Sequence, residues 1–130
     1  MSNLATLSSQ LARRELSARD ALALSIARIG ATDARVNAFT DCCLDRAMRE
    51  ADAVDAARAR GEALGPLAGV PYAVKNLFDI QGVTTRAGSR INRGLPPAGV
   101  DAVLVQHLRA AGALLVGALN MDEYAYGFTT

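Results

Sequence analysis

Two short apolar runs separated by a helical stretch constrain the fold more than any other feature of this 130-residue sequence. The first run, 69–75, reads Gly-Val-Pro-Tyr-Ala-Val-Lys, and the second, 113–117, reads Ala-Leu-Leu-Val-Gly. The stretch between them shows helical periodicity, with Asp101 as its expected N-cap and Gly112 as its stop. The order strand, crossover helix, strand is typical of a parallel sheet, so an α/β fold is predicted.

The preceding part of the chain, residues 1–64, is predicted to be mainly helical. After a first leucine-striped helix, Ser17 is the expected N-cap of a second helix that stops at Gly30. Residues 36–40 alternate as a short strand does, and a third helix is expected over 43–60. We therefore predict one domain in two parts, with helices in 1–64 and a strand-loop-helix-strand unit in 65–130.

Two parallel strands and one crossover helix do not cover both faces of a sheet. We therefore expect this chain to be the front part of a larger domain with a mixed, mostly parallel sheet. Apolar side chains of the two runs are expected to lack cover, which predicts an isolated chain that is poorly soluble, loosely packed or self-associated. These side chains are Val70, Val74, Leu114, Leu115 and Val116.

Composition and charge narrow the class of protein. Hydrophobic residues make up 51% and charged residues 21%, which indicates a folded domain rather than a disordered tail. The formal net charge of +1, with no block of like charge, argues against direct contact with nucleic acid or a membrane. No signal peptide is recognisable, and the adjacent Cys42 and Cys43 are interpreted as free thiols, so a cytoplasmic protein is expected.

Lys75 is the candidate with the clearest chemical meaning, because it ends an apolar run. On pattern alone, an exposed lysine at a strand end is favoured. The alternative is a lysine pressed against Val74, Leu77 and Phe78 at the carboxyl end of a parallel strand, where α/β sheets bind ligands. Loss of hydration lowers the pKa of a lysine, and the neutral amine can take a proton from a serine hydroxyl.

Ordinary structural roles are expected for the other polar side chains. His107 is expected to lie at the edge of the core. Asp122 and Glu123 are expected to cap a short turn that begins at Asn120. Arg86 and Arg90 are expected either to be solvated loop residues or to contact an anion. Ser89 lacks the sequence context of a nucleophile elbow.

Two motifs resemble the amidase signature family. They are G-V-P-x-x-V-K, which ends at Lys75, and A-G-A-x-x-x-G-x-x-N-M-D-E, which ends at Glu123. The stretches PYAVKNLFDI and NMDEYAYGFTT look most like the carboxybiuret hydrolase branch, which acts in s-triazine and urea-type nitrogen catabolism. The neighbouring branch, the A subunit of glutamyl-tRNA amidotransferase, usually has Lys-Asp-Asn where this chain has Lys75-Asn76-Leu77.

The resemblance implies an incomplete amidase-signature fold and hydrolysis of an amide or urea-type, carboxybiuret-like carbon–nitrogen bond. In such a site, Lys75 deprotonates a bridging serine held in a cis peptide, and this serine activates the nucleophilic serine. By position, Ala125, Tyr126 and Gly127 line the acyl pocket. The resemblance implies no metal or organic cofactor.

The family's glycine- and serine-rich segment, which carries both catalytic serines, is absent from this sequence. We therefore expect the 130-residue chain alone to be inactive, as a truncation, a fragment or one piece of a split enzyme. Two other interpretations remain open, namely an A-subunit-like part of a glutamyl-tRNA(Gln) or aspartyl-tRNA(Asn) amidotransferase and a non-catalytic remnant. The expected partners are a small amide or urea-type substrate and a small accessory subunit or a second copy of the chain.

Overall fold

One mixed three-stranded sheet lies at the centre of the computed structural model, which describes residues 3–127. The strand order is β1-β3-β2. β1 (Phe39–Cys42) is antiparallel to the central strand β3 (Leu114–Leu119), and β3 is parallel to β2 (Pro71–Lys75). The predicted α/β class, with a βαβ unit in a mixed sheet, is confirmed.

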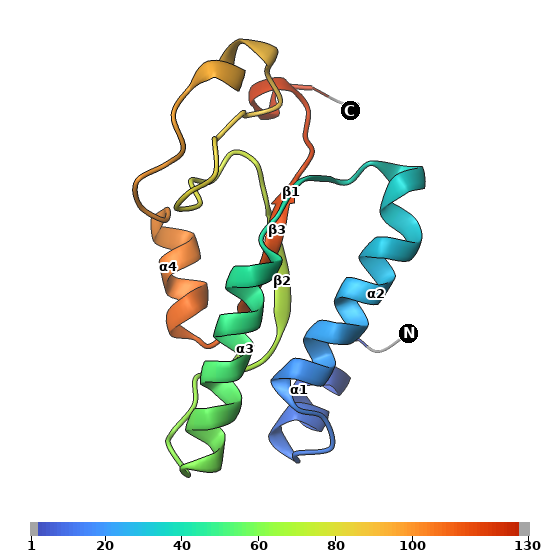
Figure 1. Ribbon diagram of the computed structural model, residues 1–130, viewed down its shortest axis with the longest axis vertical. Coiled ribbons are helices and arrows are strands. Elements are labelled where there is room, and N and C mark those ends of the chain that lie inside the picture. Colours follow the sequence, from blue (N-terminus) through green and yellow to red (C-terminus); the bar gives the residue numbers. More distant parts are fainter. Residues whose placement is uncertain (1–2, 128–130) are drawn as a thin grey trace.

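Four α-helices and two short 3₁₀ helices accompany the strands in the described residues (Figure 1). The α-helices are α1 (Leu4–Ala12), α2 (Ala18–Val36), α3 (Leu44–Ala59) and α4 (Val103–Ala110), and the 3₁₀ helices are η1 (Arg90–Gly94) and η2 (Glu123–Ala125). None of these helices is both long and apolar enough to cross a membrane.

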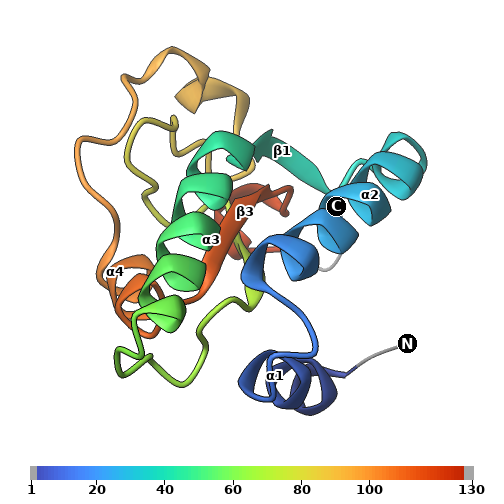
Figure 2. The same cartoon turned by 60° about the horizontal axis from the view of Figure 1, so that its bottom comes forward.

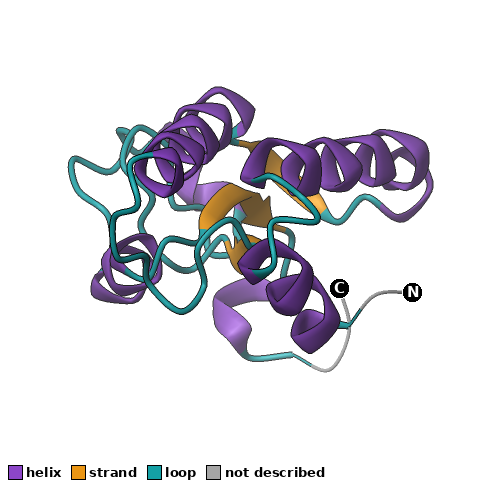
Figure 3. Cartoon of the chain, turned by 90° about the horizontal axis from the view of Figure 1, so that it is seen from below, coloured by secondary structure: helices purple, strands orange, loops and turns teal. Residues whose placement is uncertain are grey.

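Helices cover both faces of the sheet, so that the strands lie between them (Figure 3). On one face, Leu114 and Val116 pack with small side chains of α2 and α3, and Figure 2 shows α3 lying across β3. On the other face, Leu115 packs with Val74 of β2 and Val105 of α4. Alanines on α2 and α3 allow this close approach, because they present little side-chain volume.

The expectation that five apolar side chains of the strands would lack cover is therefore wrong. Val70 and Val74 are only 7% and 6% exposed, and Leu114, Leu115 and Val116 of β3 are 4% exposed or less. The helices of the N-terminal half supply the cover that two strands and one crossover helix lack by themselves.

The second helix, α2, ends later in the sequence than predicted. Ser17 caps it as expected, in a reciprocal capping box with Asp20. The helix continues through Gly30 to Val36, and Asn37 ends it with a left-handed φ of 50°. A single exposed glycine costs a helix only about 1 kcal/mol, which the packing of the rest of the helix offsets. The following strand consequently begins at Phe39, not at residue 36.

Asp101 does not cap α4, whose N-cap is Ala102 without a side-chain hydrogen bond. The Asp101 carboxylate instead accepts two hydrogen bonds of 2.8 Å from the Arg46 guanidinium and one of 2.9 Å from the backbone N–H of Gln81. His107 is exposed rather than at the core edge, and the buried residue of this helix is Val105. The Asp101 carboxylate therefore pairs with Arg46 of α3 instead of capping α4.

Candidate functional site at the carboxyl ends of two parallel strands

The carboxyl ends of β2 and β3 lie side by side, with Lys75 paired to Leu119 in the register of the sheet. The long loop after β2 and the segment after β3 therefore leave the sheet at the same edge, at the top of Figure 1. Open parallel sheets bind their ligands at this edge. Lys75 and the predicted pocket residues 125–127 are both placed there by the topology.

Lys75 is the only lysine in the sequence. Its side chain is 53% exposed, and its Nζ lies 4.0 Å from Oδ1 of Asp122. Residues 3–127 thus leave the amine partly in water, as the strand-end alternative expects, and do not enclose it among Val74, Leu77 and Phe78.

Asn76, directly after Lys75, is the polar centre of this edge and is only 1% exposed. Its side-chain Nδ2 donates to Thr40 Oγ1 at 2.7 Å and to the Asp41 carboxylate at 3.2 Å. Its Oδ1 accepts from the backbone N–H of Arg86 at 2.6 Å. One buried amide thus joins the end of β2 to β1 and to the glycine-containing loop, which holds the backbone beside Lys75 in place.

Arg86 is engaged within the protein rather than held in solvent. Its guanidinium donates to the Asp41 carboxylate at 3.2 Å and to the backbone carbonyl of Thr40 at 3.4 Å. A polar cavity of about 400 Å³ opens beside it, between β1, the loop around η1 and Asn120. Arg90 lines this cavity and is exposed, so an anion contact is still a prediction for that residue.

The expected capping of the last short turn is wrong. Asn120 Oδ1 accepts from the adjacent N–H of Met121, and the carboxylate of Glu123 accepts from the buried hydroxyl of Ser89. Asp122 is the residue before η2, but its side chain makes no capping bond to that turn. Glu123 bonds Ser89 because the loop around Ser89 packs against this turn. The Asp122 carboxylate accepts from the N–H of Gly127 instead.

The segment after β3 has an unusual backbone. Tyr124 and Ala125 both have left-handed φ angles, of 52° and 57°, which non-glycine residues adopt only when the surroundings hold them there. The N–H of Tyr124 donates to the carbonyl of Ala87 at 2.8 Å, and the N–H of Gly127 donates to Oδ2 of Asp122. Tyr126 is 95% exposed.

Asp122 was expected only to cap the turn, and its place at this edge of the sheet is what sequence reasoning missed. Asp122 contacts both Lys75 and Gly127, and so it links the two regions that were predicted to form one site. A signal for it existed, because a polar residue just beyond a parallel strand falls at the ligand-binding edge. The last three residues of the NMDEYAYGFTT motif, 128–130, lie outside the described residues.

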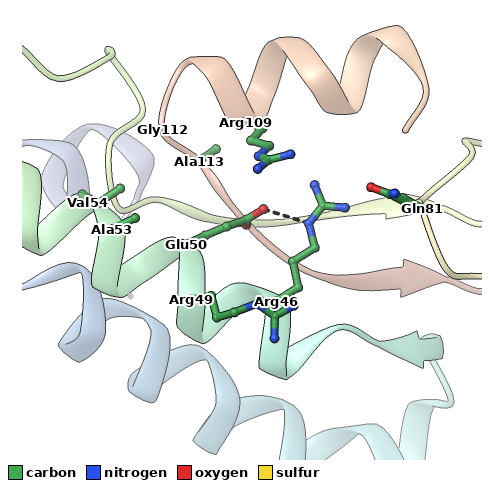
Figure 4. A pocket seen from close by; sticks show the side chains of 9 residues that line it. All are labelled: Arg46, Arg49, Glu50, Ala53, Val54, Gln81, Arg109, Gly112 and Ala113. Carbon is green, nitrogen blue, oxygen red and sulfur yellow. Dashed lines mark hydrogen bonds and ion pairs between the residues drawn. The ribbon is translucent and has the colours of Figure 1, made fainter. Parts of the chain in front are cut away.

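A separate cavity of about 630 Å³ lies between α3 and α4 (Figure 4), and Lys75 is not among the residues that line it. Arg46 and Glu50 line the cavity and form an ion pair at 2.8 Å. Arg46 also pairs with Asp101 at 2.8 Å, and Glu50 accepts from the N–H of Leu115. The hydrogen bond from Arg46 holds the pKa of Asp101 below its ordinary value. These bonds tie α3 to the sheet, so we assign this network to the fold.

Other chemistries find little support in residues 3–127. No group of three or more His, Cys, Asp or Glu side chains in this range is placed to hold a metal ion. Cys42 and Cys43 are free thiols, and burial is the main cause that raises the pKa of each. A raised thiol pKa lowers the fraction of thiolate, which is the reactive form of cysteine.

Comparison with known proteins decides the family, because the sequence model of the amidase family matches residues 20–130. The chain belongs to the amidase signature family. This amidase chain is 67% identical, over 120 residues, to AtzE of Pseudomonas sp. (strain ADP), which is a 1-carboxybiuret hydrolase subunit; the match covers 92% of this chain and 26% of that protein. It is 52% identical, over 118 residues, to the A subunit of glutamyl-tRNA(Gln) amidotransferase from Anaeromyxobacter dehalogenans (strain 2CP-C), over 90% and 24% of the two chains.

Solved structures agree with this assignment. The amidase chain superposes with a TM-score of 0.96 and 62% identity on a structure described as a vestigial protein complex that reveals the origins of an s-triazine catabolic enzyme, over 99% of this chain and 28% of the other. With peptide amidase from Stenotrophomonas maltophilia the TM-score is 0.86 at 33% identity, over 96% and 26%. The chain thus spans about a quarter of the relatives it matches, which confirms the incomplete amidase fold.

Proposed function

We propose that this chain supplies the lysine base of an amidohydrolase that cleaves a carbon–nitrogen bond in an amide or urea-type compound resembling carboxybiuret. The observation that carries the proposal is the 67% identity to a component of 1-carboxybiuret hydrolase. The position of Lys75 supports it, because the lysine stands where parallel sheets bind ligands.

In the proposed reaction, the neutral Nζ of Lys75 accepts a proton from a bridging serine, which in turn accepts the proton of the nucleophilic serine. The nucleophile attacks the substrate carbonyl, and backbone N–H groups stabilise the oxyanion. The carbon–nitrogen bond then breaks as the leaving nitrogen takes the proton held by Lys75 through the bridging serine, and water hydrolyses the acyl-enzyme. Both serines belong to the segment that this sequence does not contain. The backbone of Ala125, Tyr126 and Gly127 contacts the acyl group, and no metal or cofactor takes part.

The exposure of Lys75 is consistent with an active site that is completed by the serine segment. The Lys75 side chain is 53% exposed within residues 3–127, which leaves room for a further segment to pack over it. Packing of the serine segment over the strand ends would bring both catalytic serines to this amine. The 130-residue chain alone is therefore proposed to be inactive.

A hydrolase is preferred to part of an amidotransferase for two reasons. Identity to the hydrolase relative exceeds identity to the amidotransferase relative, at 67% against 52%. Residue 76 is asparagine where the amidotransferase branch usually has aspartate, and here its Nδ2 donates hydrogen bonds that a carboxylate cannot donate. A cytoplasmic location and a small accessory subunit complete the proposal.

The test uses a full-length amidase chain that contains residues 1–130 and the serine segment. Lys75→Ala and Lys75→Arg should each lower the initial rate of ammonia release about a hundredfold to ten-thousandfold, as loss of a general base does. Arginine fails because it stays charged and accepts no proton. Arg28→Ala, an exposed cation on α2, is the control and should keep the rate. Substantial activity in Lys75→Arg would exclude Lys75 as the base.

A further inference from the structure

Asp122 is the one carboxylate within 4.0 Å of the Lys75 amine among residues 3–127. Its side chain is only 14% exposed and is held from two directions. Its Oδ2 accepts from the N–H of Gly127, and its backbone carbonyl accepts from the N–H of Ala125 at 3.1 Å. The other carboxylate oxygen, Oδ1, is the atom nearest Lys75.

The other acidic side chains near this edge have different partners. Glu123 accepts from Ser89, Asp79 from Thr85, and Asp41 from Arg86 and Asn76. Asp122 alone divides its two oxygens between the lysine and the loop that follows β3. Asp122 makes no side-chain cap to η2, so its two carboxylate oxygens face these two partners instead.

We infer that Asp122 is a positioning residue for the proposed reaction, with one oxygen orienting Lys75 and the other holding the loop 125–127 against it. The inference rests on the proposed function of Lys75. Lysine is a flexible side chain, so a fixed carboxylate narrows the positions of its amine. Lys75 gains a positive charge when it takes the proton of the bridging serine, and Asp122 stabilises that developing charge.

The ion pair is tested first in the 130-residue chain, where Lys75 is the only lysine and its modification is read by peptide mass. An amine held in an ion pair reacts more slowly with acetic anhydride than a free amine does. Asp122→Asn should therefore speed acetylation of Lys75 at pH 8 by about twofold, the size expected for an exposed pair. Asp45→Asn removes an exposed carboxylate of α3 and should leave the rate unchanged. Equal rates in all three chains would exclude the ion pair.

The second test separates the two oxygens in a full-length amidase chain that contains residues 1–130. Asp122→Asn keeps an acceptor for Gly127 but loses the charge, so kcat should fall about tenfold to a hundredfold while KM stays within about twofold. Asp122→Ala loses both contacts and should raise KM as well. Unchanged kcat in Asp122→Asn would overturn the role in orienting Lys75, and identical constants in both variants would overturn the role in holding the loop.

These outcomes are distinguishable from failure of the proposed function. Activity retained by Lys75→Ala would refute the lysine base, and it would refute the positioning role of Asp122 with it. The acetylation rate would still report whether the Lys75–Asp122 pair exists.

Discussion

Replacing Asn76 should destabilise the protein more than any exposed substitution at the same edge. Asn76→Ala leaves the partly buried N–H of Arg86 without its acceptor, which costs about 1–3 kcal/mol. It also removes the hydrogen bonds to Thr40 and to the charged Asp41, which contribute about another 1–2 kcal/mol together. We expect a loss of about 3 kcal/mol in the free energy of unfolding.

Urea unfolding followed by far-UV circular dichroism measures this loss. With a slope of about 2 kcal/mol per molar urea, the midpoint should fall by about 1.5 M. Asn120→Ala is the matched control, because this exposed side chain makes only a long hydrogen bond of 3.4 Å to the Asn37 carbonyl and one to the adjacent N–H of Met121. Its loss should cost less than about 1 kcal/mol. A midpoint shift below about 0.5 M for Asn76→Ala would refute the claim that this amide joins the strand ends.

Three further perturbations follow from the contacts. Gly88→Ala should lower the free energy of unfolding by about 2 kcal/mol in urea titrations, because φ is +70° and a Cβ would lie 2.7 Å from backbone oxygens of the segment after β3; Gly94→Ala meets nothing within 4 Å and should be nearly neutral. The lowered pKa of Asp101 adds stability that is present above about pH 4 and lost as pH falls through that pKa. Asp101→Asn should therefore lower the melting temperature at pH 7 and flatten its decline in acid. Burial raises the pKa of Tyr72 to about 12, so its contribution to stability is lost as pH rises from about 10. Tyr72→Phe should reduce the fall in melting temperature above pH 10, and should change stability at pH 7 little, because the buried hydroxyl has no hydrogen-bond partner within residues 3–127.

Hydrophobic periodicity and glycine positions predicted most of the helices and strands. The apolar run that ends at Lys75 became β2, the run after Gly112 became β3, and the alanine-rich stretch became α3. Periodicity and glycine positions report how a segment buries one of its own faces, and that information needs no distant partner. The motif around Lys75 likewise indicated the amidase signature family, which the match over residues 20–130 confirms.

Polar side chains were predicted less well, because their partners are distant in the sequence. Asp101 was expected to cap a helix but pairs with Arg46, 55 positions away, and Asn76 bonds Thr40 across 36 positions. Capping contributes about 1 kcal/mol, whereas leaving a buried carboxylate or arginine unpaired costs about 3–5 kcal/mol, so the tertiary pairing prevails.

The sequence by itself determined the order of the elements, the family and the single lysine at the end of β2. Only the tertiary structure decided that helices of the first half cover the sheet, and that Asp122 lies between Lys75 and Gly127. The physical reason is that strand and helix propensity act over a few neighbouring residues. The partner of a charged side chain, by contrast, depends on the tertiary structure. Here the parallel pairing of β2 and β3 brings the ends of both strands to one edge of the sheet.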